Sequence, residues 1–326
     1  MKEEFNLLCY HHNDLDGKCA AAVVAYYFKH TNPDNYIESD YTGLKTELCR
    51  DNDEVFIVDY SFTEDTMEDL LDICDRARKV VWIDHHDSSI DLVKNHPELR
   101  DIDNVRIRLS KEQSGCYLTY QYFYNASQGG VPLFIQLISD YDNGNHKSLL
   151  CIDFVRGLDI EENNPTDEIW EYLFDEWEEY MEGLLEPYNE EPLPQFEDIT
   201  PLDLDDEQGD FFWHKCILDQ GTIVSVYLLT QNQSLVDDFG FESYLDNIKC
   251  FCLNAKGNPL MFGHKIKEYP MCVTFVFDGE AYNYSLYSED ESTSCKEIAE
   301  RHGGGGHKGA AGFRSPDLLV YEGLHG

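Results

Sequence analysis

The sequence predicts an α/β protein with a parallel sheet in its N-terminal part and a β-rich C-terminal part. Three apolar runs, typical of buried strands, each end in aspartate or histidine, and helix-forming segments separate them. Strands that alternate with helices form βαβ units, and right-handed crossovers bring the strand ends to one edge of the sheet. The chain has 326 residues, too many for one ordinary core, so two domains are expected.

The first apolar run, residues 5–10, leads into the polar stretch 11–17, after which small helix-forming residues dominate. Asp14 and Asp16 alternate, so an extended backbone would direct both carboxylates to one side. Gly17 allows a tight turn or a close approach of the backbone to a ligand. A lone aspartate before a helix is usually an N-cap, but two aspartates and two histidines exceed what a cap needs. The stretch is therefore a candidate ligand group.

The second run, residues 54–58, ends in Asp59, and a helix is predicted over residues 63–78. The third run, residues 80–83, ends in Asp84-His85-His86. A polar loop with two surface histidines explains this triplet equally well when it is taken alone. The parallel topology favours a site, because all three polar clusters then meet at the carboxyl edge of the sheet. A carboxylate beside imidazole suits Mn²⁺, Zn²⁺ or Fe²⁺ better than Ca²⁺.

A fourth candidate group follows an apolar helix predicted over residues 132–138, with proline at its start. Asp140 and Asp142 come directly after it. Asp140 is the better candidate because it lies closer to the apolar segment. A solvated loop is the better explanation for Asp142. Before this helix, a strand is predicted at residues 105–109 and a helix at 114–125.

An acidic, proline-containing stretch at residues 191–209 is expected to connect the domains, so that residues 1–190 form the first and residues 210–326 the second. An acidic helix with an apolar stripe is predicted within residues 167–194. The second domain is expected to be β-rich, and its predicted strands lie at residues 221–229, 249–254, 271–278 and 282–287.

A run of four glycines follows the last predicted helix, residues 294–302, and precedes His307. Consecutive glycines are unfavourable in helices and strands, but they let backbone N–H groups approach an anion closely. His307 can donate a hydrogen bond to a phosphate oxygen. A flexible linker is the alternative, which the absence of serine and the flanking ordered segments disfavour.

Composition limits the functions that the chain can have. There are 24 Lys+Arg against 64 Asp+Glu, a net charge of −40. This balance argues against binding long duplex nucleic acids and anionic membranes, but not against a small anionic substrate held by metal ions. The 11 scattered cysteines indicate buried free thiols in a reducing compartment, and no apolar run is long enough to cross a bilayer, so a cytoplasmic protein is expected.

In this order, these motifs resemble those of the DHH phosphoesterase superfamily with its DHHA1 substrate domain. The resemblance rests on residues 12–17, Asp59, Asp84-His85-His86, Asp140 and the terminal Gly-Gly-Gly-Gly-His-Lys-Gly-Ala-Ala-Gly-Phe. It implies a doubly wound parallel sheet in the first domain and a smaller mixed-sheet α/β second domain. It also implies hydrolysis of small nucleotides or short oligonucleotides with two divalent metal ions, usually manganese.

The resemblance also implies roles for single residues. Asp14, with His12, would bind the first metal ion, and Asp16, His85 and Asp140 the second. Asp59 would bridge the two ions. Asp84 would orient the cluster and His86 would face the substrate phosphate. The nucleotide or its phosphate would contact the second domain at Tyr287, Gly304, Gly305, Gly306 and His307.

Two positions depart from the family pattern. Many members carry a histidine four residues before the first aspartate, where this chain has Tyr10, whereas His12 stands two before it. Tyr287 stands where oligoribonuclease-like members often carry arginine, and it can stack on a base but cannot make a bidentate phosphate contact. A nucleotide-binding module without catalysis is the alternative function. The oligomeric state stays open, with a homodimer among the options.

Overall fold

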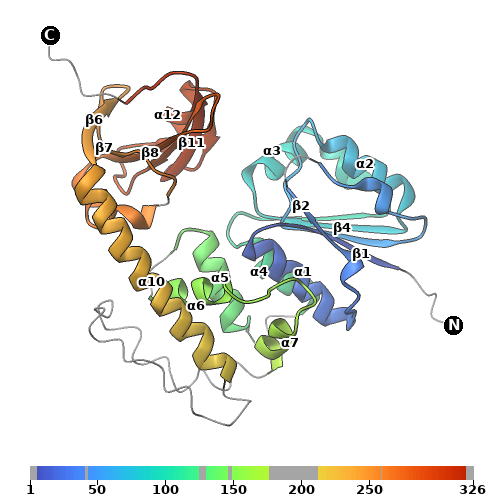
Figure 1. Ribbon diagram of the computed structural model, residues 1–326. Helices are drawn as coiled ribbons and strands as arrows, with labels where there is room; N and C mark the ends of the chain where they lie inside the picture. Colours follow the sequence, from blue (N-terminus) through green and yellow to red (C-terminus); the bar gives the residue numbers. More distant parts are fainter. Residues whose placement is uncertain are drawn as a thin grey trace. The chain divides into compact units, whose positions relative to one another are not determined.

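The computed structural model describes residues 6–40, 43–124, 130–145, 149–175, 212–257 and 259–320. It divides into two compact units, Met1–Val224 and Ser225–Gly326, which are described separately (Figure 1). The predicted acidic connection at residues 191–209 lies outside the described residues, as does most of the helix predicted within 167–194. In the described part of the chain, no helix is both long enough and apolar enough to span a membrane.

Unit 1 is built on a five-stranded sheet in the order β2-β1-β3-β4-β5, in which every neighbouring pair is parallel. Its strands are β1 Leu7–His12, β2 Tyr36–Ser39, β3 Glu54–Val58, β4 Lys79–Asp84 and β5 Val105–Leu109. The strand order changes direction between β1 and β3. In sheets of this kind, ligands bind beside such a switch point, outside the carboxyl ends of the strands. The predicted doubly wound parallel sheet is therefore confirmed.

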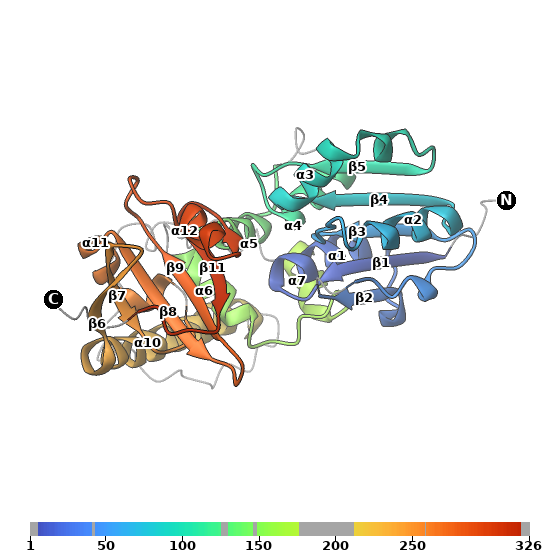
Figure 2. The same cartoon turned by 90° about the horizontal axis from the view of Figure 1, so that it is seen from above.

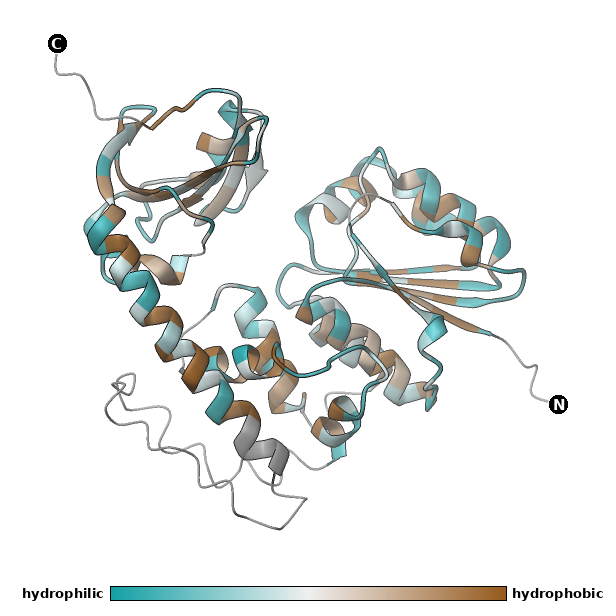
Figure 3. Ribbon diagram, in the orientation of Figure 1, coloured by the Kyte–Doolittle hydropathy of each residue, from teal (hydrophilic) through white to brown (hydrophobic). Residues whose placement is uncertain are grey.

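Helices cover both faces of this sheet (Figures 1 and 2). One face carries α2 Met67–Arg76 and α3 Asp87–Asn95, and the other carries α1 Leu15–Phe28 and α4 Gly115–Phe123. Alternate strand residues enter the two cores, so that Phe56 packs with α1 while Val55 and Ile57 pack with α2. Figure 3 shows the apolar strands between the two layers. Burial on both faces explains why these strands are apolar without alternation.

Further helices of unit 1 extend the layer beside α1. They are α5 Leu133–Asp142, α6 Leu149–Leu158 and α7 Glu168–Asp175, and short 3₁₀ turns lie at Pro33–Asn35, Thr46–Leu48 and Pro97–Asp101. Residues of α5, α6 and α7, Ile138, Phe154 and Leu173 among them, share one buried cluster with α1. The predicted helix at 132–138 is confirmed, but it continues to Asp142.

The predicted strand at residues 221–229 is wrong, because this segment lies within α10 Phe212–Phe239, a helix of 28 residues. The run of β-branched residues favours a strand, but close packing against α6 stabilises a helix here. A Cβ at Gly221 would lie 1.7 Å from the Asp153 carbonyl oxygen, and one at Gly157 would lie 1.7 Å from the Ile217 carbonyl oxygen. These two glycines let the backbones of α6 and α10 touch, and Thr222 Oγ1 donates to Asp153 Oδ2 at 2.9 Å.

Unit 2 contains a six-stranded sheet in the order β10-β11-β9-β8-β7-β6. Its strands are β6 Phe241–Leu245, β7 Ile248–Leu253, β8 Met271–Phe277, β9 Tyr282–Tyr287, β10 Gly305–Gly306 and β11 Ala310–Ser315. The pair β7–β8 is parallel and the other pairs are antiparallel, which confirms the predicted mixed sheet. Helices α11 Lys265–Glu268 and α12 Cys295–Arg301 and the 3₁₀ turn Pro259–Phe262 complete the unit. The described cysteines of both units are buried and free, as predicted.

Candidate metal centre

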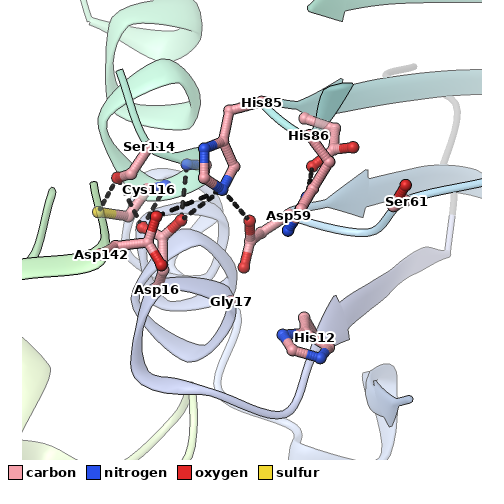
Figure 4. Close-up of polar contacts among 12 residues, drawn as sticks. His12, Asp16, Gly17, Asp59, Ser61, His85, His86, Ser114, Cys116 and Asp142 are labelled. Atoms are coloured by element: carbon pink, nitrogen blue, oxygen red, sulfur yellow. Dashed lines mark hydrogen bonds and ion pairs between the residues drawn. The ribbon is translucent and has the colours of Figure 1, made fainter. Parts of the chain in front are cut away.

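Carboxylates and imidazoles meet at the carboxyl edge of the unit 1 sheet, beside the switch point (Figure 4). They form three groups in which one ligand atom per residue lies within 4.8 Å of the others. The groups are His12, Asp14 and Asp59; Asp16, His85 and Asp142; and Asp59, Asp84, His85 and His86. Asp59 and His85 each belong to two groups, so the three form one continuous cluster.

Asp59 lies at the middle of this cluster, directly after β3. Its backbone is left-handed, with φ of 52°, and its N–H donates to the Ile83 carbonyl oxygen at 2.9 Å. Only 1% of the residue is exposed, yet neither carboxylate oxygen has a hydrogen-bond partner among the described residues. Burial, and then the charges of Asp16 and Asp14, raise the pKa of Asp59 well above its usual value. A buried carboxylate in this state must take up a proton or be neutralised by a cation.

Gly115, the first residue of α4, makes room for Asp59. A Cβ on Gly115 would lie 2.5 Å from the Asp59 Cβ and 2.7 Å from its Oδ1. Only glycine therefore allows this helix to begin so close to the carboxylate. Sequence reasoning missed Gly115, because the contact joins segments that are far apart in the chain.

Asp16 is held by the beginning of α4. Its Oδ1 accepts from Ser114 Oγ at 2.7 Å and from Cys116 N at 2.9 Å, and its Oδ2 accepts from Gly115 N at 2.6 Å. The first N–H groups of a helix lack intrahelical partners and carry partial positive charge, so they stabilise a buried anion. Asp16 is 2% exposed, and these bonds fix its orientation toward His85.

Asp14 combines two roles. Its Oδ1 caps α1 by accepting from Gly17 N at 2.9 Å, while its Oδ2 lies 2.7 Å from His12 Nδ1. Burial alone would raise the pKa of Asp14, but the bonds from His12 and Gly17 lower it. The predicted close approach at Gly17 is to the chain itself, since a Cβ there would lie 2.4 Å from the His12 carbonyl oxygen. That contact brings His12 beside Asp14.

His85 is surrounded by three carboxylates. Its Nε2 lies 3.3 Å from Asp59 Oδ1, 3.4 Å from Asp142 Oδ2 and 3.8 Å from Asp16 Oδ2. Burial, followed by the charges of Asp16 and Asp14, raises the pKa of Asp142 to about 8. Asp16, His85 and Asp142 thus form one of the three groups that could hold a cation.

Asp140, the predicted ligand, belongs to none of the three groups among the described residues; its Oδ1 accepts from Asn145 Nδ2 at 3.2 Å. The structure instead places the Asp142 carboxylate beside His85, with Oδ2 3.4 Å from Nε2. Because α5 continues through both residues, side chains two positions apart leave the helix on different faces. The sequence could not show this, since the choice depends on where the helix ends.

Within the cluster, Asp84 and His86 form a hydrogen-bonded pair. Asp84 is fully buried, and its Oδ1 lies 2.7 Å from His86 Nδ1, while its Oδ2 accepts from Ser89 Oγ. Burial alone would lower the pKa of His86, but the bond to Asp84 and its charge raise it to about 9. The Asp84 carboxylate thus favours the protonated form of His86, which lies at the N-terminal end of α3.

Residues 6–140 match the model of the DHH family, N-terminal domain. This part of the chain is a DHH-family domain. The whole chain is similar to oligoribonuclease NrnB of Bacillus subtilis, with 24% identity over 96% of this chain and 73% of that protein. It is also similar to uncharacterized protein R106 of Acanthamoeba polyphaga mimivirus, with 21% identity over 100% of this chain and 69% of that protein.

A solved structure described as the DHH domain of PF0399, a member of the S1p family of ribosomal proteins, shares the fold. The TM-score is 0.52 at 15% identity, covering 98% of this chain and 84% of that chain. The fold of the DHH domain described above thus agrees with that of a known member.

The cluster in the DHH domain fits divalent metal ions. Carboxylate oxygens and imidazole nitrogens together suit first-row metals such as manganese, iron and zinc. The fit is tested at Asp59, whose two buried oxygens accept no hydrogen bond in the part of the chain that the structure describes and which belongs to two of the ligand groups.

The glycine run of unit 2 forms part of the sheet. Gly305 and Gly306 pair with β11, and a Cβ on Gly304 would lie 2.1 Å from the Gly312 carbonyl oxygen. Gly305, Gly306 and His307 are exposed, and a Cβ on Gly305 would meet nothing within 4 Å. The end of the run is therefore an edge strand, in which Gly305 has open space for a ligand.

Tyr287 lies in the core of unit 2. It is 8% exposed, its hydroxyl donates to the Gly257 carbonyl oxygen at 2.6 Å, and its ring centroid lies 6.1 Å from that of Phe262. This burial argues against the predicted stacking on a base, because a buried ring offers no face to a ligand. The tyrosine instead anchors β9 to the segment around Gly257.

Proposed function

We propose that this protein is a metal-dependent phosphoesterase that hydrolyses phosphodiester or phosphomonoester bonds of small nucleotides or short oligonucleotides. The observation that carries the proposal is Asp59, a buried carboxylate without hydrogen-bond partners that two groups of ligands share. Membership of the DHH family and similarity to an oligoribonuclease support a hydrolase role.

Two divalent cations, Mn²⁺ by preference, fit the cluster. His12 and Asp14 would hold one, Asp16, His85 and Asp142 the other, and Asp59 would bridge them. Asp142 takes the place predicted for Asp140. When bound, two such ions lower the pKa of a bridging water and neutralise charge on phosphoryl oxygens.

The protein's own residues supply orientation and charge. The N-terminal end of α4 fixes Asp16, and Gly115 fixes the place of Asp59. His86, held by Asp84, would donate to a phosphate oxygen of the substrate, whose charge grows during attack. In unit 2, the exposed residues Gly305, Gly306 and His307, with Gly304 supporting them, would contact the nucleotide or its phosphate.

The charge of the chain favours a small substrate. With 24 Lys+Arg against 64 Asp+Glu, the chain lacks the excess of cationic side chains that binding to long nucleic acids requires. A dinucleotide or a short oligonucleotide carries few phosphates, and the proposed cations can neutralise the reacting one.

A turnover screen tests the proposal. Chelator-treated protein is supplied with Mn²⁺ and assayed on dinucleotides, short oligoribonucleotides, cyclic dinucleotides, 3′-phosphoadenosine 5′-phosphate and pyrophosphate. Hydrolysis of at least one substrate is expected, with loss of at least 100-fold in Asp59→Asn, which keeps the shape but removes the charge. No hydrolysis, or equal rates in Asp59→Asn, would refute the enzyme. Nucleotide binding without metal or turnover would favour the non-catalytic binding module instead.

A further inference from the structure

Three serine hydroxyls form a chain of contacts that ends at the Asp84 carboxylate. Ser89 Oγ donates to Asp84 Oδ2 and lies 3.2 Å from Ser61 Oγ, which in turn lies within hydrogen-bond distance of Ser88 Oγ. Ser89 is fully buried and Ser61 is 6% exposed, whereas Ser88 is exposed. The chain thus runs from the surface to the carboxylate that holds His86.

Counting protons fixes the direction of the bonds to Asp84. An ionised carboxylate only accepts, so the single proton of Ser89 goes to Asp84. The longer contact between Ser89 Oγ and Ser61 Oγ, at 3.2 Å, and the contact between Ser61 Oγ and Ser88 Oγ hold the Ser89 hydroxyl in place. His86 Nδ1 must also donate, because Asp84 Oδ1 is an acceptor. Ser89 and His86 therefore hold the two oxygens of Asp84, one oxygen each.

The two buried serines are placed by the elements that carry the metal ligands. Ser61 lies two residues after Asp59, in a turn fixed by Trp82 Nε1, which donates to the Tyr60 carbonyl oxygen at 3.0 Å. Ser89 lies in the first turn of α3. The hydroxyl chain thus connects the turn after β3 to the helix that His86 begins.

We propose that Ser89 is a positioning residue for His86 and that Ser61 supports it. Ser89 donates to Asp84 Oδ2 and so orients Oδ1 such that the His86 ring points at the reacting phosphate, while Ser61 holds the Ser89 hydroxyl in place. This inference rests on the proposed function for its substrate, but not for its geometry. A purely structural role, in which the hydroxyls only satisfy a buried carboxylate, is the alternative that the experiment must separate.

The kinetic test is a double-mutant cycle. Ser89→Ala is expected to lower kcat about tenfold, with KM and Mn²⁺ affinity near wild type, since it removes one charge-assisted bond from the support of His86. In a His86→Ala background the same change should cost nothing further, because the residue it positions is absent. Losses that multiply in the double variant would overturn the proposal. Ser243→Ala, which removes a buried hydroxyl in unit 2, is the matched control and should leave kcat unchanged.

A second readout does not need turnover. Long-range ¹H–¹⁵N spectra of the histidine rings, assigned through His86→Gln, report the Nδ1 donor. Ser89→Ala should shift the His86 ring signals, and Ser61→Ala should shift them less, while His302, which pairs with Asp246 in unit 2, stays unchanged. Unchanged His86 signals in both serine variants would refute the positioning role, even if no substrate were hydrolysed. Wild-type inactivity on every substrate would instead refute the proposed function alone. Ser61→Ala also serves if Ser89→Ala does not fold.

Discussion

Replacing Gly115 by alanine should disable the metal centre without removing any ligand. The added Cβ would lie 2.5 Å from the Asp59 Cβ and 2.7 Å from its Oδ1. Carbon atoms pack best at about 3.5–4.0 Å, so one of the two residues must retreat by about 1 Å. Asp59 cannot easily do so, because its N–H is bonded to Ile83 and its backbone is left-handed.

The expected size of the effect follows from the tolerance of metal sites. Ligand distances are held to about 0.2 Å, so a displacement of about 1 Å removes Asp59 as a shared ligand. We expect Mn²⁺ to bind about 100-fold more weakly, equivalent to about 2.7 kcal/mol. Overpacking should also lower the free energy of unfolding by about 1–3 kcal/mol.

Isothermal titration of chelator-treated protein with Mn²⁺ measures this effect. Gly305→Ala is the control for introducing a methyl group, because a Cβ there meets nothing within 4 Å and Mn²⁺ binding should not change. In an Asp59→Ala background, Gly115→Ala should weaken binding no further. A folded Gly115→Ala variant that binds Mn²⁺ as tightly as wild type would refute the reasoning.

Three further outcomes are expected. Asp142→Ala should weaken Mn²⁺ binding at least tenfold while Asp140→Ala leaves it unchanged, and titration with Mn²⁺ would contradict this if the two variants behaved alike. His85→Ala should weaken Mn²⁺ binding, whereas His86→Ala should keep it and cut turnover; the reverse pattern would refute the division of roles. Removing metal with a chelator should lower the melting temperature, since Mn²⁺ at 100 times its dissociation constant stabilises by about 2.7 kcal/mol, and calorimetry measures the difference.

The sheet of the DHH domain and the edge that carries its site could be predicted from the sequence. β1, β3 and β4 are continuous apolar runs because helices cover both faces, so their burial follows from composition without any periodic pattern. Parallel topology then places Asp59 and Asp84 at the same edge, whatever the details of packing. These predictions needed only the composition of short segments and the rule that βαβ crossovers are right-handed.

What could not be predicted depends on contacts between distant segments. Gly115 donates to Asp16 across 99 positions of sequence, and nothing near either residue indicates the other. The choice between Asp140 and Asp142 depends on the extent of α5. The segment after Gly221 fits a strand or a helix by composition, and only its contact with α6 makes it a helix.

The electrostatics of the site connect its stability to its proposed chemistry. Burial and neighbouring acids raise the pKa of Asp59 well above its usual value and that of Asp142 to about 8, so the cluster without cations must take up protons or bear repulsion. Backbone N–H groups at the start of α4 and α1 donate to Asp16 and Asp14, whereas the Asp59 carboxylate accepts no hydrogen bond among the described residues. A chain with a net charge of −40 attracts divalent cations and repels polyanions. The same charge would therefore favour filling of the proposed metal centre, and it supports the proposal of a substrate that carries few phosphates.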